Sequence, residues 1–191
     1  TVADTGKVKA ALASAASRLE AAYEVPYLAH AMMEPLNCTV KIDGDTCEIW
    51  TGTQFQTVDQ MAAAGILGTT PDKVTIHTTF LGGGFGRRAN PTSDFVAEAV
   101  IVAKAAGVPV KVVWTREDDM RGGYYRPAYV HRVQVATDKA GMPEAWHHVV
   151  VGQSILAGTP FEKFLVRNGV DATSIEGIAE SPYLEDTKAK H

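Results

Sequence analysis

A glycine-rich segment flanked by two arginines is the strongest chemical signal in this chain. Positions 80–88 read Phe-Leu-Gly-Gly-Gly-Phe-Gly-Arg-Arg. Glycine admits positive φ and lets a ligand come close to the backbone. Successive exposed N–H groups, followed by the start of a helix, attract anions, and Arg87 and Arg88 would add fixed positive charge suited to phosphate. The segment therefore predicts a backbone cradle for an anionic ligand, the alternative being a flexible loop with two solvated arginines.

The spacing of the glycines excludes the common phosphate loops. A dinucleotide G-x-G-x-x-G motif that starts at Gly82 needs glycine at position 87, which is arginine. A kinase-type motif that ends at Gly86 needs glycine at position 81, which is leucine. No Gly-Lys-Ser/Thr follows, so the segment is not a P-loop either. The cradle is of another kind.

Other polar residues have structural interpretations. The spacing of His30, Glu34 and Cys38 matches no common zinc pattern, so we expect Glu34 to be a hydrogen-bonding anchor and His30 a packed polar group. His147 and His148 are neighbours on a predicted strand, so they point to opposite faces and cannot chelate one ion. The sequence predicts no metal ligands and no catalytic residue within the chain.

The two cysteines flank a predicted hairpin turn at Asp43-Gly44-Asp45. A turn centred there places Cys38 opposite a residue near Trp50 and not opposite Cys47. We therefore expect two unpaired, half-buried thiols, and a disulfide is the alternative.

The elements that position the glycine-rich segment follow from residue patterns. Helices are predicted from Lys7 to about Ser17 with Asp4 as its cap, over 58–67, and from Thr92-Ser93-Asp94 to Ala106. Strands are predicted at 19–25, 74–80 and 108–115, and hairpins at 37–42 with 46–51 and at 129–137 with 142–151. A short helix is expected within 156–168. This order predicts an α+β fold, a mixed sheet with helices on one face, without repeats and without a clear domain boundary.

Composition narrows the class of protein. The chain has 191 residues, 46% of them hydrophobic, which fits one domain or one and a half. The net charge is −4 and no basic block stands out, so nucleic acid is not an expected partner. No apolar stretch approaches the roughly 20 residues that span a bilayer. The segment 1–9 lacks the apolar core of a signal peptide.

Three further blocks accompany the glycine-rich segment: His-Ala-Met-Met-Glu-Pro at 30–35, Thr-Gln at 53–54, and Arg-Glu-Asp at 116–118. With these four blocks in order, the chain resembles the large, molybdenum-binding subunit of xanthine-oxidase-type molybdenum hydroxylases, closest to the isoquinoline 1-oxidoreductase beta subunit and aldehyde dehydrogenase branch. The resemblance runs from about residue 19 to 152, and it implies that 1–191 is part of a molybdopterin cofactor-binding domain.

The resemblance implies roles for individual residues. In such enzymes the glutamine of the Thr-Gln block hydrogen-bonds an oxo ligand of molybdenum, which here is Gln54. Phe85 and Gly86 would face the metal site through backbone N–H groups, while Gly83 and Gly84 would let the backbone pass close to the pterin. We count Arg87 with this cofactor-binding set. The metal would be held through the pterin and not by a side chain of this chain.

The resemblance also implies chemistry and partners. Such enzymes hydroxylate N-heteroaromatic compounds or aldehydes with water as oxygen source; Ala89, where purine-oxidising members carry a substrate-binding glutamate, argues against purines. The cofactor is expected as a molybdopterin cytosine dinucleotide, with [2Fe-2S] clusters on a small partner subunit. The general-base glutamate is expected beyond His191, in the remaining C-terminal part of the large subunit.

This chain alone should therefore be inactive and cofactor-free, and an isolated fragment could self-associate. The resemblance favours a periplasmic location over a cytoplasmic one. The alternative function is a non-catalytic module that binds a phosphate ligand and keeps the fold without redox activity.

Overall fold

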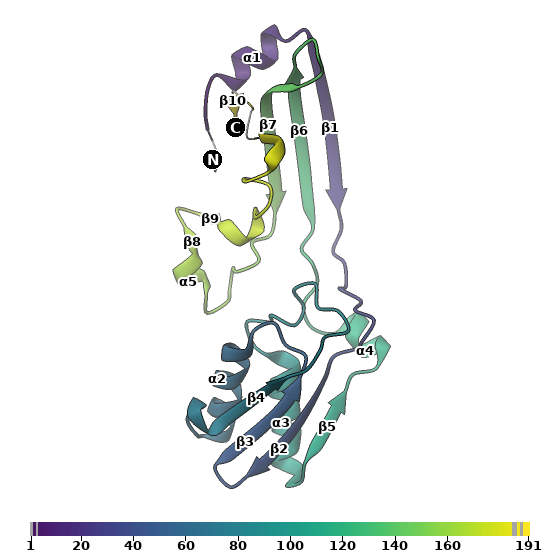
Figure 1. The fold of residues 1–191 in the computed structure, drawn as a ribbon, viewed down its shortest axis with the longest axis vertical. Helices are drawn as coiled ribbons and strands as arrows, with labels where there is room; N and C mark the ends of the chain where they lie inside the picture. Colours follow the sequence, from purple (N-terminus) through teal and green to yellow (C-terminus); the bar gives the residue numbers. More distant parts are fainter. Residues whose placement is uncertain (1, 3, 185–186, 188) are drawn as a thin grey trace. The chain divides into compact units, whose positions relative to one another are not determined.

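The chain forms two compact units in the computed structural model, which describes residues 2, 4–184, 187 and 189–191 (Figure 1). One unit is the continuous segment Leu28–Arg126, and the other combines Thr1–Tyr27 with Pro127–His191. Leu28 and Arg126 exchange backbone hydrogen bonds of 3.3 and 2.9 Å where the continuous unit begins and ends. This boundary is not apparent in the sequence, because the junctions are short bridged segments and not Gly- or Pro-rich linkers.

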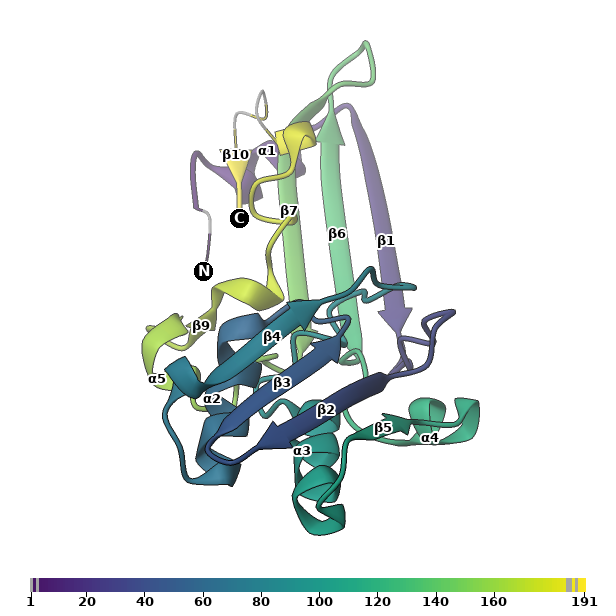
Figure 2. The same cartoon turned by 60° about the horizontal axis from the view of Figure 1, so that its bottom comes forward.

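The continuous unit, which we call the central unit, contains a four-stranded mixed sheet in the order β4-β3-β2-β5. The strands are β2 (Asn37–Asp43), β3 (Thr46–Thr51), β4 (Val74–Thr78) and β5 (Val110–Val113). β2 pairs antiparallel with β3 and β5, whereas β3 and β4 run parallel. Helices α2 (Gln56–Leu67) and α3 (Asp94–Ala106) lie on one face of this sheet (Figure 2). The short helices are η1 (Pro71–Lys73) and α4 (Arg116–Arg121).

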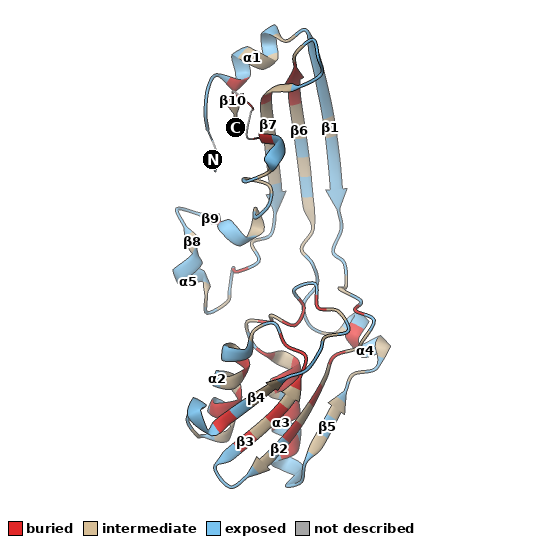
Figure 3. Ribbon diagram, viewed as in Figure 1, coloured by how far each residue is buried: buried red, intermediate tan, exposed pale blue. Residues whose placement is uncertain are grey.

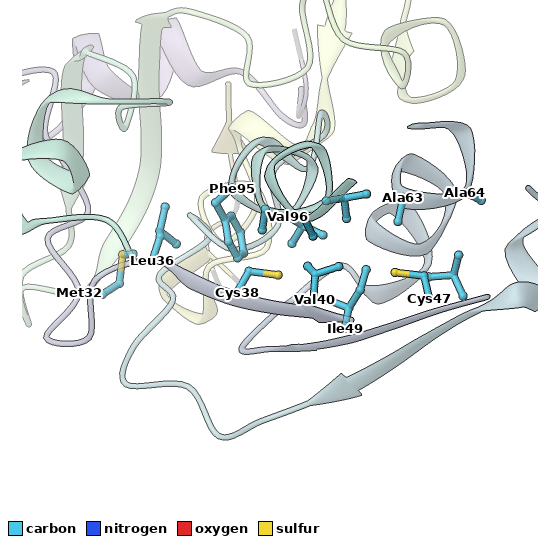
Figure 4. Close-up of a cluster of buried hydrophobic side chains, with 14 residues drawn as sticks. Met32, Leu36, Cys38, Val40, Cys47, Ile49, Ala63, Ala64, Phe95 and Val96 are labelled. Atoms are coloured by element: carbon cyan, nitrogen blue, oxygen red, sulfur yellow. The ribbon is translucent and has the colours of Figure 1, made fainter. Parts of the chain in front are cut away.

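The core of the central unit lies between this sheet and the two helices (Figures 3 and 4). Burial alternates along β2 and β3, as a half-buried sheet requires, and α3 adds side chains at helical spacing. The inward side chains include Cys38, Val40, Cys47 and Ile49 from the strands and Phe95, Val96, Ala99, Val100 and Ala103 from α3. Cys38 lies opposite Thr51 and Cys47 opposite Ile42, and both thiols are free, as predicted. They are fully buried and not half-buried as expected, because both side chains point into this core.

The unit formed by the two chain ends, which we call the terminal unit, has a second sheet in the order β1-β6-β7-β10. Its strands are β1 (Ser17–Val25), β6 (Tyr129–Thr137), β7 (Pro143–Gly152) and β10 (Ala189–Lys190). β1 pairs antiparallel with β6, and helix α1 (Val8–Ser14) packs through Val8 against Ala136 and Ala145. The remaining short elements are α5 (Glu162–Leu165), β8 (Val166–Arg167), β9 (Val170–Asp171), η2 (Ala172–Ser174) and η3 (Pro182–Leu184).

The predicted α+β class is confirmed, and the predicted strands and helices occur within a few residues of their expected bounds. The predicted strands divide between two sheets, whereas one was expected, and β8 pairs with β9 in a separate two-stranded sheet. The expected caps are also corrected: Lys7, not Asp4, precedes α1, and Ser93 precedes α3 in a left-handed conformation without a side-chain cap. Within the described part of the chain, no helix has the length and apolar character needed to cross a membrane.

Candidate functional site

The glycine-rich loop, residues 82–86, lies between β4 and α3 in the central unit. Gly83 and Gly86 have φ of +105° and +93°, a region that residues with a Cβ rarely adopt. Gly82 and Gly84 are needed for space instead. A Cβ at Gly82 would overlap Glu34, and a Cβ at Gly84 would overlap the side-chain amide of Gln54. Two glycines therefore set the course of the loop, and two let other segments approach it.

Gln54 contacts this loop directly, as expected for two parts of one site. Its backbone N–H donates to the Arg88 carbonyl at 3.0 Å, and its Oε1 accepts from the Gly86 N–H at 3.2 Å. That bond assigns the orientation of the amide, because only the oxygen can accept. The Nε2 group of this exposed side chain has no acceptor among the described residues. Gln54 therefore presents a neutral N–H donor beside the loop.

Phe85 gives the loop an unusual conformation. It has φ of +52°, which is uncommon for a residue with a side chain, and 66% of its surface is exposed. Its carbonyl accepts from Nη1 of Arg126 at 3.2 Å. In the described part of the chain, no acceptor is recorded for the backbone N–H groups of Gly83, Gly84 and Phe85. Consecutive uncommitted donors of this kind suit oxygen atoms of a ligand.

Arg87 does not point into solvent. Its guanidinium forms two hydrogen bonds with the Asp94 carboxylate, at 3.0 and 2.7 Å, and lies 5.5 Å from the centre of the Trp114 ring. The residue is 3% exposed. The alternative of a solvated arginine is therefore wrong for Arg87, whose charge is paired with Asp94. Direct contact of Arg87 with a cofactor stays a prediction.

Arg88 is completely buried, and its guanidinium hydrogen-bonds other parts of the protein. Its Nε donates to the Gly83 carbonyl at 2.8 Å, its Nη1 to the Gly52 carbonyl at 3.1 Å, and its Nη2 to the carbonyl and Oε2 of Glu34, both at 3.0 Å. Burial lowers the pKa of Arg88, and the nearby Glu34 carboxylate counteracts that effect. A sequence shows that an arginine follows the loop but not which acceptors it reaches, so this role was missed.

Glu34 is the predicted hydrogen-bonding anchor. Its Oε2 accepts from the Gly82 N–H at 2.7 Å, and its Oε1 accepts from Nδ2 of Asn37 at 2.8 Å. Burial raises the pKa of Glu34, but the hydrogen bonds from Asn37 and Gly82 and the charge of Arg88 outweigh it and hold the pKa below its ordinary value of 4.5. The carboxylate is ionised at neutral pH. The hydrogen bond from Asn37 to Glu34 was not predicted, because the segment that joins them is not a regular helix whose geometry would bring the side chains together.

His30 belongs to the central unit, whereas His147 and His148 lie on β7 of the terminal unit. Burial lowers the pKa of His30, and the charges of Arg126 and Arg87 lower it further, so this residue is a neutral packed group. His148 contacts His131 at 3.0 Å and His147 contacts Gln134 at 3.2 Å, which confirms that the adjacent pair faces opposite sides of the sheet. In the described part of the chain, no three His, Cys, Asp or Glu residues lie close enough to hold a metal ion.

The donors at the loop that have no acceptor among the described residues are neutral: three backbone N–H groups and the Gln54 amide. Such donors can hold oxygen or sulfur atoms of a bound group without adding charge to it. The space that a Cβ at Gly84 would fill is taken by the side-chain amide of Gln54, so glycine at this position lets Gln54 lie against the loop backbone. Because the loop and Gln54 supply only neutral hydrogen-bond donors, the site suits a bound cofactor that itself carries the reactive atoms.

The comparisons with known proteins agree with this chemistry. A family model described as the molybdopterin cofactor-binding domain matches residues 1–170. The isoquinoline 1-oxidoreductase subunit beta of Brevundimonas diminuta is 43% identical over 129 residues, covering 66% of this chain and 16% of that protein. The membrane-bound aldehyde dehydrogenase [pyrroloquinoline-quinone] of Gluconacetobacter polyoxogenes is 30% identical over 175 residues, covering 85% of this chain and 22% of that protein.

A solved structure, quinoline 2-oxidoreductase from Pseudomonas putida 86, superimposes with a TM-score of 0.66 at 17% identity. The match covers 84% of this chain and 21% of that one, and at this identity it shows the fold. The chain thus spans 16% to 22% of the length of these relatives. The expected domain extent of 1–191 stays a prediction.

Proposed function

This chain belongs to the molybdopterin cofactor-binding domain family, and from that premise we propose that it supplies the first part of the cofactor site in a larger oxidoreductase. The whole enzyme would hydroxylate N-heteroaromatic or aldehyde substrates with water as oxygen source. The names of the isoquinoline and aldehyde relatives support this substrate class. One of those names includes pyrroloquinoline-quinone, which is not part of the proposal for this chain.

The observation that carries the proposal is the contact between Gln54 and the glycine-rich loop. Gln54 Oε1 is held by Gly86, so the Nε2 donor and the N–H groups of Gly83, Gly84 and Phe85 remain for a ligand. When bound, the molybdenum cofactor would supply the two-electron oxidation. The residues of this chain would bind and orient it through neutral hydrogen bonds, and the buried arginines would keep the loop in place.

The finer parts of the proposal are the cytosine dinucleotide form of the cofactor, the iron–sulfur partner subunit and the remaining part of the large subunit. The subunit names among the relatives support an enzyme of several parts. A phosphate-binding module without redox activity gains no support. Arg87 and Arg88, the cations that such a module would use, are buried and paired with Asp94 and Glu34.

The test compares two glutamine variants of the whole subunit that carries this sequence. Gln54→Ala removes the proposed donor, whereas Gln56→Ala removes an exposed side chain at the start of α2. We expect Gln54→Ala to lower substrate-dependent dye reduction by about a hundredfold or more, the scale of losing one positioned donor, with Gln56→Ala unchanged. Molybdenum content is measured in parallel. Full activity of Gln54→Ala, or a wild-type subunit without molybdenum, would refute the proposal.

A further inference from the structure

Three chain segments that are distant in sequence meet at the Arg88 guanidinium. It binds the carbonyl of Gly83 in the glycine-rich loop, the carbonyl of Gly52 before Thr53-Gln54, and both the carbonyl and the carboxylate of Glu34. The hydrogen bonds span 5, 36 and 54 positions of sequence. No other connection described above joins all three segments through a single side chain.

The main chain of Arg88 adds a fourth connection. Its carbonyl accepts from the Gln54 N–H at 3.0 Å. The backbone of Gln54 is thus tied to Arg88 directly, and its side chain is tied to Gly86, two residues before Arg88. The position of the Gln54 amide therefore depends on where the Arg88 side chain and main chain are held.

We infer that Arg88 is a positioning residue, which places Gln54 and the glycine-rich loop so that their free N–H groups converge. The inference rests on the proposed function for what those donors hold. Arginine is required because its planar fork reaches acceptors in three directions, whereas lysine donates from a single point. The Glu34 carboxylate offsets the buried charge and fixes Gly82 at the same time.

The test measures hydrogen exchange of individual amides by NMR in the 191-residue chain, without cofactor. The reporters are the N–H groups of Gln54, Gly82 and Gly86, with Ala99 and Ala103 in α3 as internal standards for the stability of the unit. In Arg88→Lys we expect exchange of all three reporters to rise together by about tenfold or more, with α3 unchanged. Arg121→Lys, an exposed position on α4, is the control and should leave every rate unchanged.

Because removal of the buried guanidinium could unfold the unit, Glu34→Gln is measured as a second variant. It keeps the shape and the carbonyl acceptor but removes the charge partner, so we expect a smaller joint rise at the same three amides. Unchanged rates in both variants, or a rise at only one segment, would overturn the inference. Equal loss of protection in α3 in both variants would also overturn it, because the ion pair would then serve overall stability alone.

A separate readout distinguishes this inference from the proposed function. In the whole subunit, Arg88→Lys should lower molybdenum retention while Arg121→Lys retains it. If the wild-type subunit binds no molybdenum, the proposed function fails, but the exchange rates still decide whether Arg88 positions Gln54. If molybdenum is bound and Arg88→Lys changes neither retention nor exchange, the positioning role fails alone.

Discussion

The backbone N–H of Gly86 donates to Oε1 of Gln54 at 3.2 Å, across 32 positions of sequence. This single bond decides which end of the amide faces outward. Without it, Gln54 could present either an oxygen or an N–H group to a ligand, since an amide can rotate by half a turn. With it, the outward group is the donor.

Gly84 should tolerate no side chain. A Cβ there would overlap the Gln54 amide, so Gly84→Ala should displace Gln54 and break its bond to Gly86. We expect the free energy of unfolding to fall by about 1–3 kcal/mol, as for other overpacked positions. The whole subunit should also lose molybdenum. Urea unfolding and metal analysis measure the two effects.

The matched control is Gly65→Ala within α2, where nothing lies within 4 Å of an added Cβ. This change should raise the free energy of unfolding by up to about 1 kcal/mol, the difference in helix propensity between glycine and alanine. Equal changes in the free energy of unfolding for the two substitutions would show that contact with Gln54 is not the reason for glycine at position 84.

Stability should depend on pH through Glu34. Its pKa in the folded chain lies below the ordinary 4.5, so its carboxylate stabilises the fold above that value and the contribution is lost as pH falls through the folded pKa. The difference in unfolding free energy between wild type and Glu34→Gln should be largest at neutral pH and narrow below about pH 4.5. Chemical denaturation across this range measures it. A difference that widens on acidification would contradict the ion pair.

The two thiols should be unreactive in the folded chain. Burial raises the pKa of Cys38 to about 12 and that of Cys47 to about 11, so almost no thiolate is present at neutral pH. Alkylation of the native chain should be slower than in urea by roughly a hundredfold or more. Denatured, unreduced chain should show two free thiols. A missing pair would reveal the disulfide that the β2–β3 register excludes.

The 191-residue chain alone should lack stoichiometric molybdenum and substrate-dependent turnover. A general base must be within about 2.6–3.2 Å of the proton that it takes. Two carboxylates near the motifs have other partners: Glu34 binds Gly82 and Arg88, and Glu98 accepts from Trp114 Nε1 at 2.6 Å. Metal analysis with aldehyde- and N-heterocycle-dependent dye reduction decides the matter. Turnover without added subunits would show that the chain is a complete enzyme.

The sequence predicted the features that depend on short-range residue patterns. Alternation and turn residues located the 37–51 hairpin and its cysteine register, and glycine spacing located the loop. The resemblance to the family predicted that Gln54 shares a site with that loop. The sequence did not reveal that Arg87 binds Asp94 or that Arg88 binds Gly52 and Gly83. Those partners are set by how separate segments pack, and an arginine beside a loop looks the same in sequence whether it binds a ligand or the protein.

The division into two units was also beyond sequence reasoning. A strand pattern at 17–25 predicts a strand but not its partner, and β1 pairs with β6 and not with any strand of the central unit. Hydrophobic alternation gives the face that a strand buries, whereas partner choice depends on the whole topology.

The insertion of the central unit between β1 and β6 has a consequence for biosynthesis. A ribosome adds about 5–20 residues per second, and roughly a hundred residues separate the two strands, so β1 waits for several seconds before its partner emerges. During that interval the central unit, whose strands and helices are contiguous in sequence, can fold first. Its closure at Leu28 and Arg126 then brings the ends of β1 and β6 together, which shortens the loop that their pairing must close. Slow translation or a destabilised central unit would leave β1 as an unpaired strand, open to aggregation or to capture by a chaperone.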